Sequence, residues 1–196
     1  QEPYTPLPGG FVNAEYNSIS AIKDATTSQT CAVMLEVVQG EGGVNIPDDD
    51  YLKEVRAWCD QKGLLLVLDE VQTGIGRLGT LFGYQQFGVE PDILTLGKSL
   101  GGGLPMAAML ARTELATALG PGSHAVTMGG SPLVAQAGLW AFRKLTENGF
   151  LEKSRQMSTY LREKLESLRP VPVVQDIRGI GMIQAMELNV PARPVA

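Results

Sequence analysis

A strand–helix–strand pattern in the first half of the chain strongly limits what the chain can fold into. The apolar run at residues 32–35 is followed by a segment at 51–59 whose apolar residues recur at helical spacing, and then by Leu64–Leu68. Gly63 is placed to end that helix. Because a helical crossover between two buried strands makes them parallel, the predicted fold class is α/β with a mostly parallel sheet flanked by helices.

The rest of the chain predicts further strands, at residues 93–96 and 106–110. The pattern changes after about Ser131 and predicts two helices followed by two strands, at residues 133–145, 150–168, 171–174 and 182–188. Four residues should form the apolar face of the second helix: Met157, Leu161, Leu165 and Leu168. We therefore place a soft domain boundary near residue 146, with domains at residues 1–145 and 146–196.

Two of the expected strands end in a residue that could do chemistry. Leu64–Leu68 leads into Asp69, and the run at 93–96 leads through Gly97 into Lys98. Parallel strands have their carboxyl ends at the same edge of the sheet, where ligands bind. A carboxylate and an amine are thus predicted to face one pocket. Such a pair suits a pyridoxal phosphate (PLP) enzyme, which needs an imine-forming amine and a partner for the pyridine nitrogen.

Composition excludes several other classes of function. The 196 residues carry a net charge of −5, which argues against a nucleic-acid surface. There is no apolar stretch long enough to span a bilayer and no secretory signal pattern. Cys31 and Cys59 are expected to be buried, reduced thiols in a cytoplasmic protein. With His124 as the single histidine, we expect no metal site and only a structural role for that residue.

Two phosphate-binding patterns occur in the wrong context. Residues 74–79 match G-x-G-x-x-G, but five residues separate them from the preceding strand, and the expected acidic residue is missing. Gly97-Lys98-Ser99 resembles the end of a P-loop, but Asp92 occupies the position of its leading glycine. Neither pattern predicts a nucleotide site here.

Three segments, in this order and spacing, resemble the class III, or ornithine-type, PLP-dependent aminotransferases. They are EVVQGEGG at residues 36–43, DEVQTGIGR at 69–77 and PDILTLGKSLGGG at 91–103. The resemblance extends over essentially the whole chain. It implies the fold-type I PLP-dependent transferase architecture, in which this chain would supply part of the large PLP-binding domain and the start of a small α+β C-terminal domain.

The resemblance also implies which residues hold the cofactor. Lys98 would form the covalent imine with pyridoxal 5'-phosphate and then move a proton between substrate and cofactor, which requires a neutral amine. Asp69 would pair with the pyridine nitrogen, Val71 would pack against the ring, and Gln72 would hydrogen-bond the 3′ oxygen. Taken by themselves, the lysine and the aspartate could also be ordinary polar residues after a strand.

Substrate binding and the contact with a second subunit are implied in the same way. Glu41 resembles the family's switch glutamate, which masks an arginine while the amino donor is bound, and Glu36 would lie near the same pocket. Thr127 would reach the cofactor phosphate of the other subunit of a homodimer, although Met128 and Ser131 depart from the family pattern. Arg178 matches a family signature without an assigned role.

The implied reaction moves an amino group from an ω-amine, such as N-acetylornithine, to 2-oxoglutarate, as in arginine biosynthesis. Several other enzymes share every one of these motifs: the ornithine, 4-aminobutyrate and succinylornithine aminotransferases and the class III aminomutases. A non-catalytic relative that keeps the fold is a further alternative. The chain begins with Gln1, and the family's phosphate-binding loop and substrate arginines would lie outside residues 1–196. We therefore expect no appreciable turnover from residues 1–196 alone.

Overall fold

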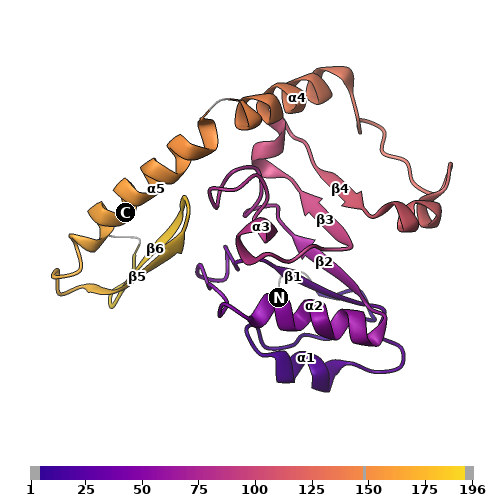
Figure 1. Cartoon of the computed structure of the whole chain (residues 1–196), viewed down its shortest axis with the longest axis horizontal. Coiled ribbons are helices and arrows are strands. Elements are labelled where there is room, and N and C mark those ends of the chain that lie inside the picture. Colours follow the sequence, from indigo (N-terminus) through magenta and orange to yellow (C-terminus); the bar gives the residue numbers. More distant parts are fainter. Residues whose placement is uncertain (1–4, 148, 193–196) are drawn as a thin grey trace.

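The centre of the molecule is a four-stranded sheet in the order β1-β2-β3-β4 (Figure 1). The structure is a computed structural model and describes residues 5–147 and 149–192. Strands β1 (Ala32–Glu36), β2 (Leu65–Asp69) and β3 (Ile93–Leu96) are parallel, whereas β4 (Ala108–Ala111) runs antiparallel to β3. The predicted α/β class with a mostly parallel sheet is confirmed.

Helix α2 (Tyr51–Lys62) is the crossover between β1 and β2, and it covers one face of the sheet. Its apolar side buries Leu52, Val55 and Cys59, and Gly63 ends it in the left-handed conformation at φ 66°. The short α1 (Ile19–Ala25), which the sequence analysis did not anticipate, packs beside α2. The buried apolar residues of this layer, which include Ile22 of α1 and Leu52, Val55 and Cys59 of α2, belong to the main core of the protein.

The opposite face of the sheet is less buried. Side chains alternate along each strand, so Leu66 and Leu68 of β2 are fully buried while Val67 and Asp69 are half-buried. At the carboxyl end of the parallel strands, register places Asp69 between Glu36 of β1 and Thr95 of β3. This row of polar residues lies on the half-open face, where a ligand could reach it.

A buried carboxylate joins the sheet to α2. Asp92 is 8% exposed and accepts hydrogen bonds from the Leu66 backbone N–H (2.7 Å) and from Arg56 Nη1 (2.7 Å), while Arg112 Nη1 lies 3.3 Å away. Burial alone raises the pKa of Asp92, but the N–H of Leu66 and the Arg56 guanidinium lower it more, so that the pKa lies below its ordinary value. Asp92 therefore remains charged and links β2, α2 and the residue that follows β4.

Short helices and α4 support the residues after β3. These segments are α3 (Tyr84–Phe87), η2 (Lys98–Gly101), η3 (Thr113–Leu119) and α4 (Pro132–Thr146). Helix α4 packs on η2, and a Cβ added to Gly102 would lie 3.3 Å from the Cβ of Ala141. The small residues therefore allow α4 to approach the Lys98 segment closely.

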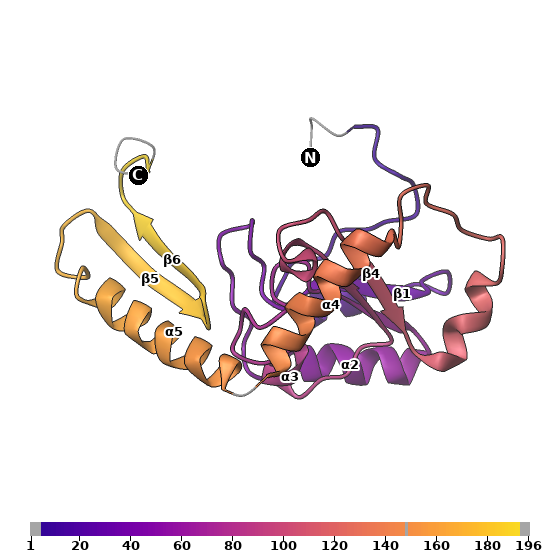
Figure 2. The ribbon, with the colours of Figure 1, turned by 90° about the horizontal axis from the view of Figure 1, so that it is seen from above.

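Helix α5 (Phe150–Glu166) and the hairpin of β5 (Val174–Ile180) and β6 (Ile183–Leu188) lie together at one end of the molecule (Figures 1 and 2). Ser158 Oγ donates to Gly181 O (2.6 Å), and Arg162 Nη2 donates to Ile177 O (3.0 Å). Helix α4 ends at Thr146, beside the boundary predicted near residue 146, but the division into two domains stays a prediction. In the described part of the chain, no helix combines the length and apolarity needed to cross a membrane.

Several local predictions were wrong. Residues 171–173 form turns instead of a strand, since Val171 N donates to Leu168 O and Pro172 has no N–H for a ladder. The strand therefore begins at Val174 and contains Arg178 and Gly179, which were expected in a connection. The strand predicted at 106–110 is shifted to Ala108–Ala111.

One burial prediction, that for Cys31, failed. On the expected apolar face of α5, Leu161 and Leu165 are half-buried, while Met157 and Leu168 are 45% and 41% exposed. The helix also makes polar contacts with the hairpin through Ser158 and Arg162. Cys31 is exposed because it precedes β1, whereas Cys59 is buried as predicted.

Candidate active site

Lys98 has an unusual backbone conformation directly after β3. Its φ is 45°, in the left-handed region, and the side chain is exposed. A non-glycine residue there costs of order 1–3 kcal/mol, and such strain is concentrated at functional sites. Gly97 before it is buried, and a Cβ at Gly97 would lie 3.3 Å from Val71 Cγ1. The turn after β2 and the Lys98 segment are therefore in close contact.

A cavity of about 230 Å³ opens beside the Lys98 side chain. It is lined by residues of the turn after β2, of η2 and of the β5–β6 hairpin: Val71, Gln72, Arg77, Lys98, Ser99, Met182 and Ile183. Lys98 thus lines the same cavity as Val71 and Gln72, the two residues that the resemblance implied would also contact the cofactor. The sequence analysis assigned no role to Arg77, although it ends the segment at 69–77, and it did not anticipate Met182 and Ile183, which lie far away in the sequence.

Asp69 is held at the end of β2, on the half-open face of the sheet. Its Oδ1 accepts a hydrogen bond from the Val71 N–H at 2.9 Å, which fixes the orientation of the carboxylate. Next to it in register, the buried Thr95 Oγ1 has no hydrogen-bond partner among residues 5–147 and 149–192. The prediction that Asp69 and Lys98 face one pocket is thus not borne out by this cavity, because Asp69 does not line it and is connected to it only by the hydrogen bond from Val71.

Glu36 is connected by a hydrogen bond to Gly40, which packs against the cavity-lining residue Gln72. The Gly40 N–H donates to Glu36 Oε2 at 3.1 Å, and a Cβ on Gly40 would overlap the Gln72 amide. A larger residue at this position would require the Gln72 amide to move. Glu36 and Gln72 are therefore connected to one loop, at residues 39–45, which we call the 39–45 loop.

The 39–45 loop carries Glu41 and is closed at its base. Gln39 and Asn45 exchange two backbone hydrogen bonds of 3.0 and 2.9 Å, and the Asn45 amide also donates to Gln39 Oε1 (3.0 Å). Glu41 is exposed near the tip. Val44 has φ 54°, which is an outlier for a β-branched residue. The loop is thus a small, defined and strained structure.

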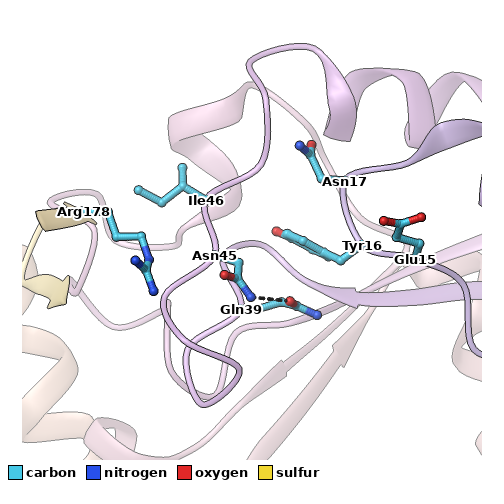
Figure 3. A pocket seen from close by; sticks show the side chains of 7 residues that line it. All are labelled: Glu15, Tyr16, Asn17, Gln39, Asn45, Ile46 and Arg178. Carbon is cyan, nitrogen blue, oxygen red and sulfur yellow. Dashed lines mark hydrogen bonds between the residues drawn. The ribbon is translucent and has the colours of Figure 1, made fainter. Parts of the chain in front are cut away.

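A second cavity, of about 540 Å³, lies on the outer side of this loop (Figure 3). Its lining comes from the segment before α1, from the base of the 39–45 loop and from β5: Glu15, Tyr16, Asn17, Gln39, Asn45, Ile46 and Arg178. Figure 3 shows Arg178 on one side of the loop and Tyr16 on the other. The base of the loop therefore lines this cavity between Arg178 and Tyr16.

Thr127 is not brought to either cavity. It lies in an exposed segment between η3 and α4, together with His124 and Met128. Figure 2 shows this segment looping out on the side of the sheet opposite α5 and the hairpin. A contact between Thr127 and a cofactor phosphate therefore requires another subunit and stays a prediction.

Glu70, which the sequence analysis did not assign, stabilises the loop that follows Asp69. Its fully buried carboxylate accepts hydrogen bonds from the N–H groups of Gly83 and Tyr84, each at 2.6 Å. Burial raises the pKa of Glu70, while these two N–H groups oppose the increase. Because Glu70 follows Asp69 directly, it fixes the chain on the core side of the sheet while Asp69 faces the other side.

Comparison with known proteins gives consistent matches. The family model described as "Aminotransferase class-III" matches residues 9–194. The acetylornithine aminotransferase of Caldanaerobacter subterraneus subsp. tengcongensis is 46% identical over 187 residues, which cover 95% of this chain and 47% of the relative. The chain spans about half the length of the curated relatives that it matches.

Solved structures match with similar coverage. The acetylornithine aminotransferase from Elizabethkingia anophelis superposes with a TM-score of 0.87 at 33% identity, covering 92% of this chain and 46% of that one. The ornithine aminotransferase from Toxoplasma gondii gives a TM-score of 0.88 at 35% identity, covering 95% and 45% of the two chains. That structure is described as having partial occupancy of PLP at the active site.

Proposed function

Because this chain belongs to the class III aminotransferase family, we propose that its protein uses PLP to transfer an amino group from N-acetylornithine to 2-oxoglutarate. The single observation that carries this proposal is the cavity in which Lys98, Gln72 and Val71 meet beside the end of β2. The curated relatives named acetylornithine aminotransferase, at 41–47% identity, support the choice of amino donor and a role in arginine biosynthesis.

The residues of the site fit the cofactor. The cavity offers a primary amine, a side-chain amide and an aliphatic surface, and the Asp69 carboxylate lies beside it. The chemistry that bound PLP supplies is an electrophilic aldehyde and a ring that accepts an electron pair. An amine, a ring-packing valine and a carboxylate are the groups that this chemistry requires.

We assign the proton transfer to Lys98. Its Nζ would hold the cofactor until the donor amine takes its place, and would then remove the proton from the carbon that bears the substrate amine. The exposed side chain at the edge of the cavity is accessible to a substrate. The strained backbone at Lys98 orients the side chain toward the cavity side of η2, which is the reason such a conformation would be retained.

We assign the charge partner of the pyridine nitrogen to Asp69. The Val71 N–H holds one carboxylate oxygen and leaves the other available on the half-open face. Val71 would then contact the ring, and Gln72, which is packed against Gly40, would donate to the 3′ oxygen. Glu36 and Glu41 would act on the substrate side through the 39–45 loop.

Replacing Asp69 with asparagine is expected to lower kcat/KM about 10²–10³-fold, because a neutral amide cannot keep the pyridine nitrogen protonated. The measurement is steady-state transamination of N-acetylornithine by the complete protein. Asp60→Asn, an exposed change on α2, is the matched control and should leave kcat/KM unchanged. Equal activity of Asp69→Asn and the wild type would remove Asp69 from the site.

We also propose a cytoplasmic homodimer whose site is completed by the partner subunit. The exposed segment that carries Thr127 supports this arrangement, because it projects away from its own cavity and is available for a contact between subunits. Sedimentation of the complete protein would test the dimer.

The donor can be tested by incubating the complete protein with PLP and 2-oxoglutarate and a panel of amines. N-acetylornithine is expected to give the highest kcat/KM among N-acetylornithine, ornithine, succinylornithine and 4-aminobutyrate. Ornithine is the second candidate, since solved ornithine aminotransferases have TM-scores of up to 0.89 with this chain. Binding of PLP without turnover of any amine would instead support a non-catalytic relative.

A further inference from the structure

We propose that Arg178 is a positioning residue that holds the 39–45 loop, and with it Glu41, in place while the amino donor is bound. The inference rests on the proposed function, in which Glu41 masks a substrate-reading arginine during the donor half of the reaction. It gives a role to a residue that contacts neither cavity-lining Lys98 nor Gln72. Its evidence is a contact between residues 135 positions apart in the sequence.

The guanidinium of Arg178 donates two hydrogen bonds to one backbone carbonyl of the 39–45 loop. Nε donates to Gly43 O at 3.0 Å, and Nη2 donates to the same oxygen at 2.8 Å. On its other side, Nη1 donates to Asp176 Oδ2 (3.0 Å) and Glu187 Oε2 (2.6 Å). The two carboxylates belong to β5 and β6, so they fix the guanidinium to the hairpin. The hairpin is thereby attached to the loop through one side chain.

Displacement of Gly43 would be transmitted to Glu41 because the loop is closed on itself. The N–H groups of Gly43 and Val44 both donate to Gly40 O at 3.1 Å. At its other end, Gly40 is held by the Glu36 carboxylate and packs against the Gln72 amide. Glu41 therefore lies between two fixed points, Gly40 on the cofactor side and Gly43 on the Arg178 side.

The backbone of the loop requires support from outside. Gly43 has φ 119° and Val44 has φ 54°, and the second value is strained for a β-branched side chain. Such a conformation persists only where surrounding contacts impose it. Arg178 supplies the contact at this point, with a charge-assisted pair of donors that is stronger than a neutral hydrogen bond.

The hydrogen bonds of Arg178 also distinguish positioning from substrate binding. All three guanidinium nitrogens are already engaged, by Gly43 O, Asp176 and Glu187. The carboxylates of Asp176 and Glu187 offset the positive charge of Arg178 at short range, and this weakens its attraction for a substrate carboxylate. Arg178 therefore acts through the loop.

The test compares the two half-reactions in the complete, PLP-loaded protein by stopped-flow absorbance. In Arg178→Met, kcat/KM for the half-reaction with N-acetylornithine should fall about tenfold or more, because a small displacement of a positioning group is costly. The half-reaction with glutamate, in which Glu41 has moved aside, should change by less than about threefold. Arg178→Lys, which keeps the charge but loses the fork, should be intermediate.

Arg169→Met is the matched control. Arg169 also donates to a carbonyl of β5, Ile177 O, and pairs with a carboxylate, Glu166, but it does not touch the 39–45 loop. This variant should leave the ratio of the two half-reactions unchanged. Equal losses in both half-reactions of Arg178→Met and Arg178→Lys would indicate a merely structural role and overturn the inference, as would no loss in either.

A double-mutant cycle shows whether the effect passes through Glu41. In a Glu41→Gln background, the further change Arg178→Met should add no loss to the donor half-reaction, because the group that Arg178 positions is already absent. Independent, multiplicative losses would refute the inference while leaving the proposed function intact. A wild-type protein that binds PLP but transfers no amino group would refute the proposed function itself and the inference with it.

Discussion

A protein with alanine in place of Lys98 is expected to lose at least about 10⁴-fold in kcat, because both the covalent attachment point and the proton-transferring base are removed. PLP that is bound covalently to a lysine absorbs at about 420 nm, and this absorbance band should also be missing. Both effects follow from the position of the amine in the cavity shared with Val71 and Gln72. The measurements are an absorbance spectrum and a single-turnover assay with N-acetylornithine.

Lys153→Ala provides the matched control for this experiment. Lys153 is an exposed lysine of α5 that does not line the cavity, and its removal should change neither the spectrum nor the rate. If Lys98→Ala kept the band and the activity of the wild type, another amine would hold the cofactor. The assignment of the active site to the end of β3 would then be wrong.

The largest effect on stability is expected at Asp92. Asp92→Ala should lower the free energy of unfolding by about 3–5 kcal/mol, because it leaves the half-buried Arg56 without its buried partner and the Leu66 N–H without an acceptor. Urea unfolding of the complete protein, followed by circular dichroism, measures the change. The activity assay is unsuitable here, since a destabilised sheet would also displace Asp69.

Asp60→Ala is the control, because Asp60 forms an exposed ion pair with Arg56, the arginine that also forms the buried pair with Asp92. Asp60 lies 2.7 Å from Arg56 Nη2, but its side chain is 65% exposed, so its loss should cost only about 0–1 kcal/mol. Equal destabilisation by the two variants would contradict the importance of burial at Asp92.

The pH dependence of this contribution has a defined sign. Because the pKa of Asp92 in the folded protein lies below its unfolded value, its contribution is fully present above the ordinary aspartate pKa. The contribution is lost as pH falls through the lowered pKa. The difference in unfolding free energy between wild type and Asp92→Ala should therefore be constant near neutral pH and shrink in strong acid.

The sequence predicted the strands that precede Asp69 and Lys98, because their apolar runs have the length and flanking residues of buried strands. Parallel pairing places the ends of those strands at one edge of the sheet, but the cavity beside Lys98 is not lined by Asp69, so the roles of both residues stay predictions. The role of Arg178 could not be predicted in this way. Its partner Gly43 lies 135 residues away, and a carbonyl contact leaves no mark in residue type or spacing.

Two other differences concern the C-terminal part of the chain. The strand expected at 171–174 begins later because Pro172 interrupts it and the Val171 N–H donates to Leu168 O in the turn after α5. The expected apolar face of α5 is only half-buried at Leu161 and Leu165, and the hairpin meets that helix through Ser158 and Arg162 as well. Periodicity identifies a helix, whereas the neighbour that it meets is determined by tertiary structure.

The link between Arg178 and Gly43 also bears on the order in which the protein is made. The 39–45 loop leaves the ribosome long before β5 and β6, so it must first exist without the contact that restrains Gly43 and Val44. Such non-local pairing is slow to form, because it requires the closure of a long intervening segment. During synthesis, the Glu41 loop would acquire its final shape only after Glu187 has emerged, which makes the maturation of the substrate side a late event of folding.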